Sequence, residues 1–205
     1  PCANNYRPLD MRFDKARCAP TVTLSADERS ASNGKTVWGP VVGDEYLASG
    51  VYEVEIGCDS VDNLSLFFGV CAPGYWEEVA KAAADEEEGD ILPRDSPHCI
   101  CMHGDGRCFI KGKEKDWGLM RVATGENVKL TLDFNRGQVT FELNRVVRGK
   151  AKCTIAEIPG LFASATVVAC FGGRDQQLTI AKCAERKAGA SDDGAESSAP
   201  RRKVR

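Results

Sequence analysis

The stretch LDFNRGQVTFELN, residues 132–144, contains parts of two strand-like runs on either side of a turn. Residues 128–133 and 138–143 are rich in β-branched and aromatic side chains, which favour strands. Asn135, Arg136 and Gly137 lie between these runs and suit a turn slightly longer than the tightest hairpin, because asparagine and glycine adopt positive φ at little cost. The stretch therefore predicts two antiparallel strands joined by a short turn.

Similar runs recur along the chain at intervals of about ten residues, which is typical of a β-sandwich or barrel. In VYEVEI, residues 51–56, apolar and acidic side chains alternate, so one face of the expected strand is apolar and the other carries Glu53 and Glu55. Residues 64–71 are almost continuously apolar and predict a strand covered on both faces. Asn33-Gly34 and Asp105-Gly106 are each expected to close a tight hairpin.

Two segments depart from the strand pattern. Residues 76–88 are rich in alanine and acids and predict a short helix inserted between two groups of strands. Residues 184–205 have no large apolar side chain before Val204 and are expected to be disordered, with a basic end that suits either a nuclear import signal or an incidental charge cluster. We therefore expect an N-terminal extension (1–19) packed on the sandwich, one domain (20–183) and a tail (184–205).

The composition is that of a globular protein, with 42% hydrophobic and 28% charged residues and a formal net charge of −3. This charge gives no broad positive field, so nucleic acid is not the expected partner. No apolar run approaches the roughly 20 residues of a transmembrane helix, and the first residues lack the regions of a signal peptide. The 10 cysteines are spread through strand-like sequence, which favours reduced, buried side chains in an intracellular protein, cytoplasmic or nuclear.

Four stretches, in order, resemble the SPRY domain family. The most specific is residues 132–144, which is similar to the family's hairpin pattern of Leu-Asp, Gly, Val, Phe and Asn. Two departures stand out: Arg145 follows Asn144 where the family usually has glycine, and the alanine-rich insertion has no common counterpart. The other three stretches are LSAD (24–27) with TVW (36–38), SGVYEVE (49–55) with FGV (68–70), and GDGR (104–107).

The resemblance implies an all-β, concanavalin-like sandwich of two antiparallel sheets, with the short helical insertion near residues 76–88. It also implies recognition of proteins, often of an extended peptide, by loops at one end or by the concave face of a sheet. The matching residues are mainly structural. Three glycines allow turns or close packing and three aromatic side chains fill the core: Gly50, Gly69, Gly137, Trp38, Tyr52 and Phe141.

Residues 98–108 contain the densest group of possible metal ligands. In a strand, Cys99, Cys101 and His103 share one face, and Cys108 beyond the turn could approach them, so zinc binding is an alternative to simple packing. A catalytic thiol is not favoured, because His98 and Cys99 are neighbours and point to opposite faces of a strand.

Glu53 and Glu55 lie two residues apart, as do carboxylate pairs of sandwich glycosidases. The motif of that class continues with a further acid where this chain has Cys58. Two acids that face solvent are therefore the favoured interpretation, with glycan cleavage as the alternative.

Residues 73–76, Pro-Gly-Tyr-Trp, are the favoured partner-binding feature, because large aromatics dominate interface energetics. A loop could present Tyr75 and Trp76 to a partner, but core packing is the favoured interpretation of these two side chains. Arg29, Lys35 and Arg174 lie on expected turns and are further candidates.

The sequence therefore predicts a non-catalytic adaptor or scaffold domain that recognises a peptide segment of another protein through surface loops. A carbohydrate-binding or glycan-cleaving sandwich is the first alternative, and a zinc-stabilised regulatory module is the second. In the favoured interpretation the chain is not an enzyme and uses no metal or other cofactor and no membrane.

Overall fold

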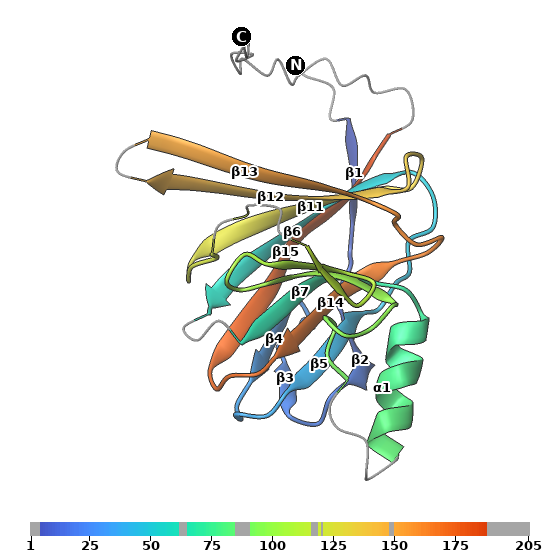
Figure 1. Cartoon of the computed structure of the whole chain (residues 1–205), viewed down its shortest axis with the longest axis vertical. Helices are drawn as coiled ribbons and strands as arrows, with labels where there is room; N and C mark the ends of the chain where they lie inside the picture. The colour runs from blue at the N-terminus through green and yellow to red at the C-terminus, as the bar shows by residue number, and fades with distance from the viewer. Residues whose placement is uncertain are drawn as a thin grey trace.

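The computed structural model describes residues 5–61, 65–84, 91–115, 119, 121–147 and 150–187. In this part of the chain, an eight-stranded and a seven-stranded antiparallel sheet face each other (Figure 1). The strands of the eight-stranded sheet run in the order β13 (Lys150–Pro159), β12 (Gln138–Val147), β11 (Glu126–Asp133), β6 (Val51–Ser60), β15 (Gln176–Arg186), β4 (Ser30–Asn33) and β3 (Val22–Leu24), with β1 (Tyr6–Leu9) beside the second half of β15. The seven-stranded sheet has the order β10 (Lys113–Lys115), β9 (Cys108–Ile110), β8 (Cys99–His103), β7 (Leu66–Cys71), β14 (Thr166–Phe171), β5 (Gly39–Gly43) and β2 (Phe13–Cys18).

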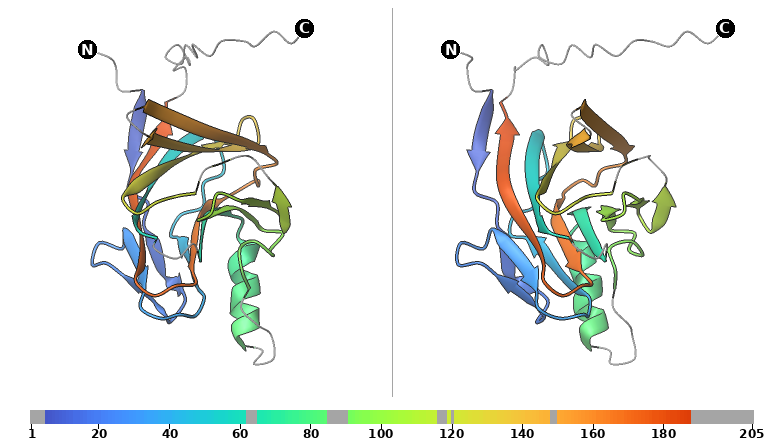
Figure 2. Two further views of the ribbon diagram at one scale, coloured as in Figure 1. Left: turned by 60° about the vertical axis from the view of Figure 1, so that its left-hand side comes forward. Right: turned by 90° about the vertical axis from the view of Figure 1, so that its left-hand side faces the viewer.

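The apolar core lies between the two sheets. On β6, Tyr52, Val54 and Ile56 point into this core, as the alternation predicts, and the intervening glutamates point away from it. Every position of β7 is buried, because its inner face lies in the core and its outer face is covered as well. Part of that cover is the helix α1 (Gly74–Ala84), which Figure 2 shows running beside the seven-stranded sheet.

The last two strands of the domain occupy central places in their sheets. β14 lies between β7 and β5, and β15 lies between β6 and β4. Figure 1 shows both in orange, among strands coloured blue to blue-green. β14 thus joins β5 to β7, and β15 joins β4 to β6.

The hairpin predicted from residues 132–144 is confirmed, with β11 paired to β12 from Val128↔Leu143 to Asp133↔Gln138. Gly137 in its turn has φ 63°, which favours glycine. β12 then continues to Val147, four residues beyond the part that pairs with β11. Arg145 thus extends the strand where a glycine would have allowed a turn.

Several expected boundaries differ from the structure. The N-terminal extension supplies β1 and β2, so it belongs to the sheets, and β15 continues through Arg186, past the expected limit at residue 183. The helix begins at Gly74, two residues earlier than expected, while residues 85–88 and the tail from 188 lie outside the described residues. Asp105-Gly106 joins the paired strands β8 and β9, but Asn33-Gly34 does not close a hairpin, because β4 and β5 belong to different sheets.

Candidate interaction surface

Tyr75 is fully buried, so it packs in the core and is not presented to a partner on a loop. It lies in the first turn of α1, packs on the outer face of the seven-stranded sheet, and donates a hydrogen bond to the Ile91 carbonyl oxygen (3.2 Å). Burial raises its pKa well above the usual value. Trp76 is half-buried against the same cluster. Tyr75, Val79 and Ala82 have the spacing of one helix face, and this signal was missed because the helix was expected to start at residue 76.

Lys35 and Arg174 are exposed on two loops that the structure brings together, residues 34–38 and 172–175, which we call the loop pair. The buried Asn33 joins these loops. Its side-chain amide donates to the backbone carbonyl oxygens of Val37 (2.8 Å) and Phe171 (3.1 Å). The backbone carbonyl oxygen of Asn33 accepts a hydrogen bond from the Asp175 backbone amide (2.8 Å).

One further contact connects the two loops. The Trp38 ring lies against the backbone of Gly172, where an added Cβ would be 2.7 Å from ring atoms. Asp175 has φ 62°, in the left-handed region that Asp tolerates in turns. Val37, on the first loop, is 48% exposed. The loop pair is therefore an ordered surface that combines the apolar Val37, the cations of Lys35 and Arg174, and the carboxylate of Asp175.

Arg29 lies apart from the loop pair, because it precedes β4 whereas Lys35 follows it. Its guanidinium donates to Asp10 (2.8 Å), which also accepts from Arg12. These hydrogen bonds, from Arg12 first and Arg29 second, lower the pKa of Asp10 to about 2. Arg29 thus ties the turn before β4 to the segment after β1, and we do not include it in the candidate surface.

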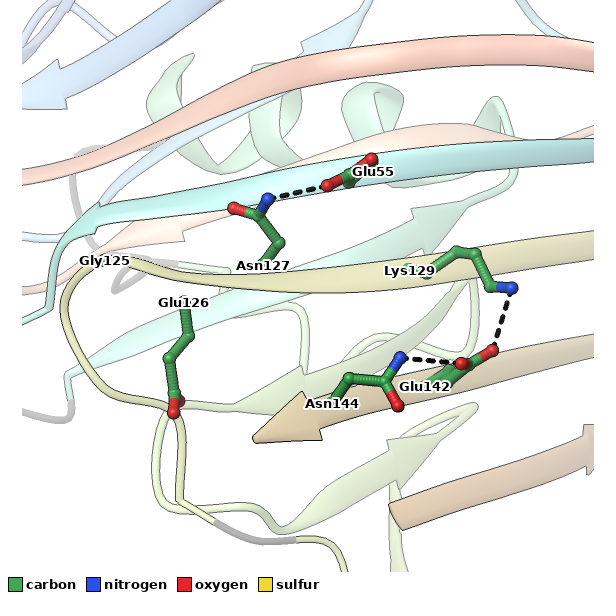
Figure 3. A pocket seen from close by; sticks show the side chains of 7 residues that line it. All are labelled: Glu55, Gly125, Glu126, Asn127, Lys129, Glu142 and Asn144. Atoms are coloured by element: carbon green, nitrogen blue, oxygen red, sulfur yellow. Dashed lines mark hydrogen bonds and ion pairs between the residues drawn. The ribbon is translucent and has the colours of Figure 1, made fainter. Parts of the chain in front are cut away.

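A second polar surface lies on the outer face of the eight-stranded sheet (Figure 3). This hollow has a volume of about 460 Å³ and is lined by side chains from β6, β11 and β12. Asn127 donates to Glu55 (2.6 Å), and Glu142 accepts from Asn144 (2.7 Å) and pairs with Lys129 (2.9 Å). Burial alone would raise the pKa of Glu142, but the hydrogen bonds from Lys129 and Asn144 outweigh it and lower that pKa. The polar groups of this hollow are largely engaged with one another.

The two carboxylates considered for glycan cleavage have separate partners. Glu53 accepts a hydrogen bond from the Tyr6 hydroxyl (2.8 Å) and lies 3.8 Å from Arg186, whereas Glu55 accepts from Asn127. Both face outward, as predicted, and their hydrogen bonds connect β1 and β11 to β6. Sequence reasoning did not find the residues of β11 and β12 that share this face, although their alternation could have shown them.

The structure does not gather the possible metal ligands of residues 98–108. Cys99 and Cys101 lie on the outer face of the seven-stranded sheet, while Cys108 lies in the core between the sheets. The His103 ring packs on Phe67, with ring centroids 4.7 Å apart. Within the described residues, no group of three or more His, Cys, Asp or Glu side chains is placed to hold a metal ion.

The Cys99 thiol is not activated by its neighbour. Burial raises its pKa well above the usual value, and the His98 ring lies instead 3.6 Å from Glu78. None of the nine described cysteines forms a disulfide, and seven of them are buried, which agrees with the packing role expected for them. The described helix is not long and apolar enough to span a membrane.

No family model and no curated protein matches this sequence. Among solved structures, the SPRY domain of human HERC1 is similar over 83% of this chain and 97% of its own, with a TM-score of 0.64 and 14% identity. The PSpry domain of TRIM65 covers 85% of this chain and 92% of its own (TM-score 0.59, 16% identity). Stonustoxin is similar over 83% of this chain and 27% of its own (TM-score 0.59, 14% identity).

These likenesses define the class of fold as the β-sandwich of SPRY domains, which confirms the fold expected from the sequence. In particular, the chain reproduces the whole sandwich of the HERC1 domain, since almost all of that domain is covered.

Proposed function

We propose that this chain is a non-catalytic interaction domain that binds an extended segment of a partner protein at the loop pair. The observation that carries the proposal is the network of hydrogen bonds around Asn33, which holds the two loops together. An ordered surface loses little conformational entropy on binding, so more of the contact free energy contributes to affinity. The SPRY-type fold supports a binding role, because such domains are known interaction modules.

The exposed groups of the loop pair indicate the chemistry of the partner segment. Val37 offers an apolar contact, and Lys35 and Arg174 offer one cation on each loop. An apolar side chain flanked by carboxylates would complement this arrangement. We therefore propose an acidic, partly apolar peptide segment as the ligand, in place of the aromatic contact first expected at Tyr75.

Peptide display tests this proposal. Randomised peptides would be selected on the purified chain, and we expect enrichment of sequences with an apolar residue next to Asp or Glu. The variant Val37→Asp/Arg174→Glu should bind the selected peptides at least about tenfold more weakly, because it removes the apolar contact and reverses a charge. The control Lys115→Glu alters an exposed lysine on β10, four strands away from β14, and should bind as the unchanged chain does.

Two outcomes would overturn the proposal. Selection could yield no reproducible peptide, or the selected peptides could bind the loop-pair variant as well as the unchanged chain. Sugar binding on a glycan array, lost on changing Glu55 but not Arg174, would instead support the carbohydrate alternative.

We place the domain inside the cell, in the cytoplasm or the nucleus. The support is the free, mostly buried thiols, since chains that fold around reduced cysteines need a reducing compartment.

A further inference from the structure

The two sheets have several edge strands, and most of them carry features that discourage pairing with another chain. In the described residues, β3 has three residues and β1 has four, including Pro8. β2 has an irregular register against β5, and the three residues of β10 are all exposed and charged. β13 differs, because it has 10 residues and pairs regularly with β12 along its whole length (Figure 1).

The register of β13 determines which of its backbone groups face outward. The Gly160 amide donates to the Gly137 carbonyl oxygen (2.8 Å), in line with the pairing of β12 and β13. Hydrogen-bonded and non-hydrogen-bonded pairs alternate in antiparallel strands, so Thr154 and Ala156 bond to β12. The amides and carbonyls of Cys153, Ile155 and Glu157 therefore point away from the sheet, as a row of donors and acceptors two residues apart.

The side chain of Ile155 is the most exposed large hydrophobic group in the described residues, at 55%. Ala156 and Ile158 point into the core, so the side chains of Cys153, Ile155 and Glu157 share the opposite face. Burying one exposed isoleucine against another apolar group would be favourable. The free edge and the exposed apolar group thus coincide on one strand.

We propose that β13 is a self-association edge, at which a second copy of this chain pairs antiparallel through its own β13 about a two-fold axis at Ile155. A second copy fits this edge, because a two-fold axis at Ile155 sets the exposed isoleucine against its own counterpart and each Glu157 against a neutral Cys153. The pairs 153↔157, 155↔155 and 157↔153 would exchange about six hydrogen bonds. Each Ile155 would then pack beside the other on one face, in an isologous contact.

Two other registers of the β13–β13 pair would be less favourable. Centring the axis at Glu157 would place two carboxylates opposite each other and bring Pro159, which has no amide hydrogen, into the ladder. Centring it at Cys153 would separate the two Ile155 side chains. The Ile155 register avoids both defects, since it sets Glu157 against the neutral Cys153.

Sedimentation velocity over a wide range of protein concentrations tests the association. We expect a concentration-dependent dimer, and Ile155→Lys should raise the dissociation constant at least about tenfold by placing two like charges together. The matched control is Val37→Lys, which changes the other exposed large hydrophobic group and should leave the dimer intact. A monomer at all concentrations, or a dimer that Ile155→Lys does not weaken, would overturn the proposal.

Cross-linking tests the register independently. In a Cys153→Ser background, Ile155→Cys should form an intermolecular disulfide under mild oxidation, because directly opposed Cα atoms in a hydrogen-bonded antiparallel pair are about 5.5 Å apart. Glu157→Cys in the same background should cross-link far less, since its own counterpart lies several residues along the strand. Equal cross-linking of the two variants would contradict this register. The inference does not depend on the loop pair, so either proposal can fail without the other.

Discussion

Burial controls the reactivity of the cysteine side chains. It raises the pKa of Cys58 and of Cys183 to about 12, and only Cys153 is exposed among the nine described cysteines. Because the thiolate is the reactive form, we expect iodoacetamide to modify Cys153 first among these nine in the dilute folded chain, and the seven buried thiols only on unfolding. Peptide mass spectrometry over a time course measures this order. Labelling of Cys71 or Cys99 as fast as Cys153 would contradict it.

Tyr75 stabilises the domain from its buried position beneath α1. Tyr75→Ala should lower the free energy of unfolding by about 3–5 kcal/mol, because it leaves a cavity between the helix and the sheet. Tyr75→Phe keeps the ring and loses only the hydrogen bond to Ile91, so a loss of about 1 kcal/mol is expected. Urea unfolding of the two variants gives both values. Similar small losses in both would show that the ring is not packed as described.

Glu142 links stability to pH. The pKa of Glu142 is lowered in the folded state. Its contribution to the free energy of unfolding is therefore present above the pKa of the unfolded chain and is lost as pH falls through the pKa of the folded chain. Glu142→Gln should therefore reduce the free energy of unfolding by about 0.5–1 kcal/mol at neutral pH, and the difference should vanish in strong acid. Unfolding curves at several pH values measure this. A difference that grows toward low pH would have the wrong sign.

Among the strands, β7 shows how closely the seven-stranded sheet is packed. A Cβ added at Gly69 would lie 2.3 Å from the Ile100 carbonyl oxygen, a backbone atom that cannot move aside without disturbing β8. Gly69→Ala should therefore destabilise the domain by about 1–3 kcal/mol. Gly57→Ala on β6 is the matched control, because its Cβ would meet neighbours no closer than 3.5 Å. Equal melting temperatures for the two variants would contradict this packing.

The strands that local pattern defines were predictable from the sequence. The alternation in residues 51–56 predicts the two faces of β6, and the turn at Asn135 to Gly137 predicts the β11–β12 hairpin. The surroundings of Asn33 were not predictable from the sequence. Asn33-Gly34 has the pattern of a hairpin turn, but Asn33 is buried between two loops from distant parts of the chain. The partners of that side chain depend on β15 lying beside β4, a long-range contact that no local pattern encodes.

The helix and the edge strand show the same limit. The composition of residues 76–88 predicts α1 but not its start at Gly74, so the sequence does not show that Tyr75 lies in the first turn of the helix and is buried there. The absence of glycine at 145 was visible in the sequence, yet the length of the resulting β12–β13 pair follows only from the register. Two of the five expected binding residues, Lys35 and Arg174, lie together in the loop pair.

For the whole molecule, packing between the sheets holds the fold, so we expect no dependence on a metal. Cys108 lies on the opposite face of its sheet from Cys99 and Cys101, which leaves these thiols without a shared coordination centre. The melting temperature should therefore be the same with and without a strong chelator. A lower melting temperature with the chelator, together with stoichiometric zinc in the purified chain, would support the zinc-stabilised alternative.

The central places of β14 and β15 have a consequence for how the chain acquires its structure during synthesis. Until residues 166–186 leave the ribosome, the strand that lies between β5 and β7 is missing, and so is the strand that lies between β4 and β6. Pairing across such sequence separations is slow, because the intervening chain must be closed into a loop first. The nascent chain therefore carries open strand edges until its last strands arrive, and these edges are the surfaces that chaperones protect from aggregation.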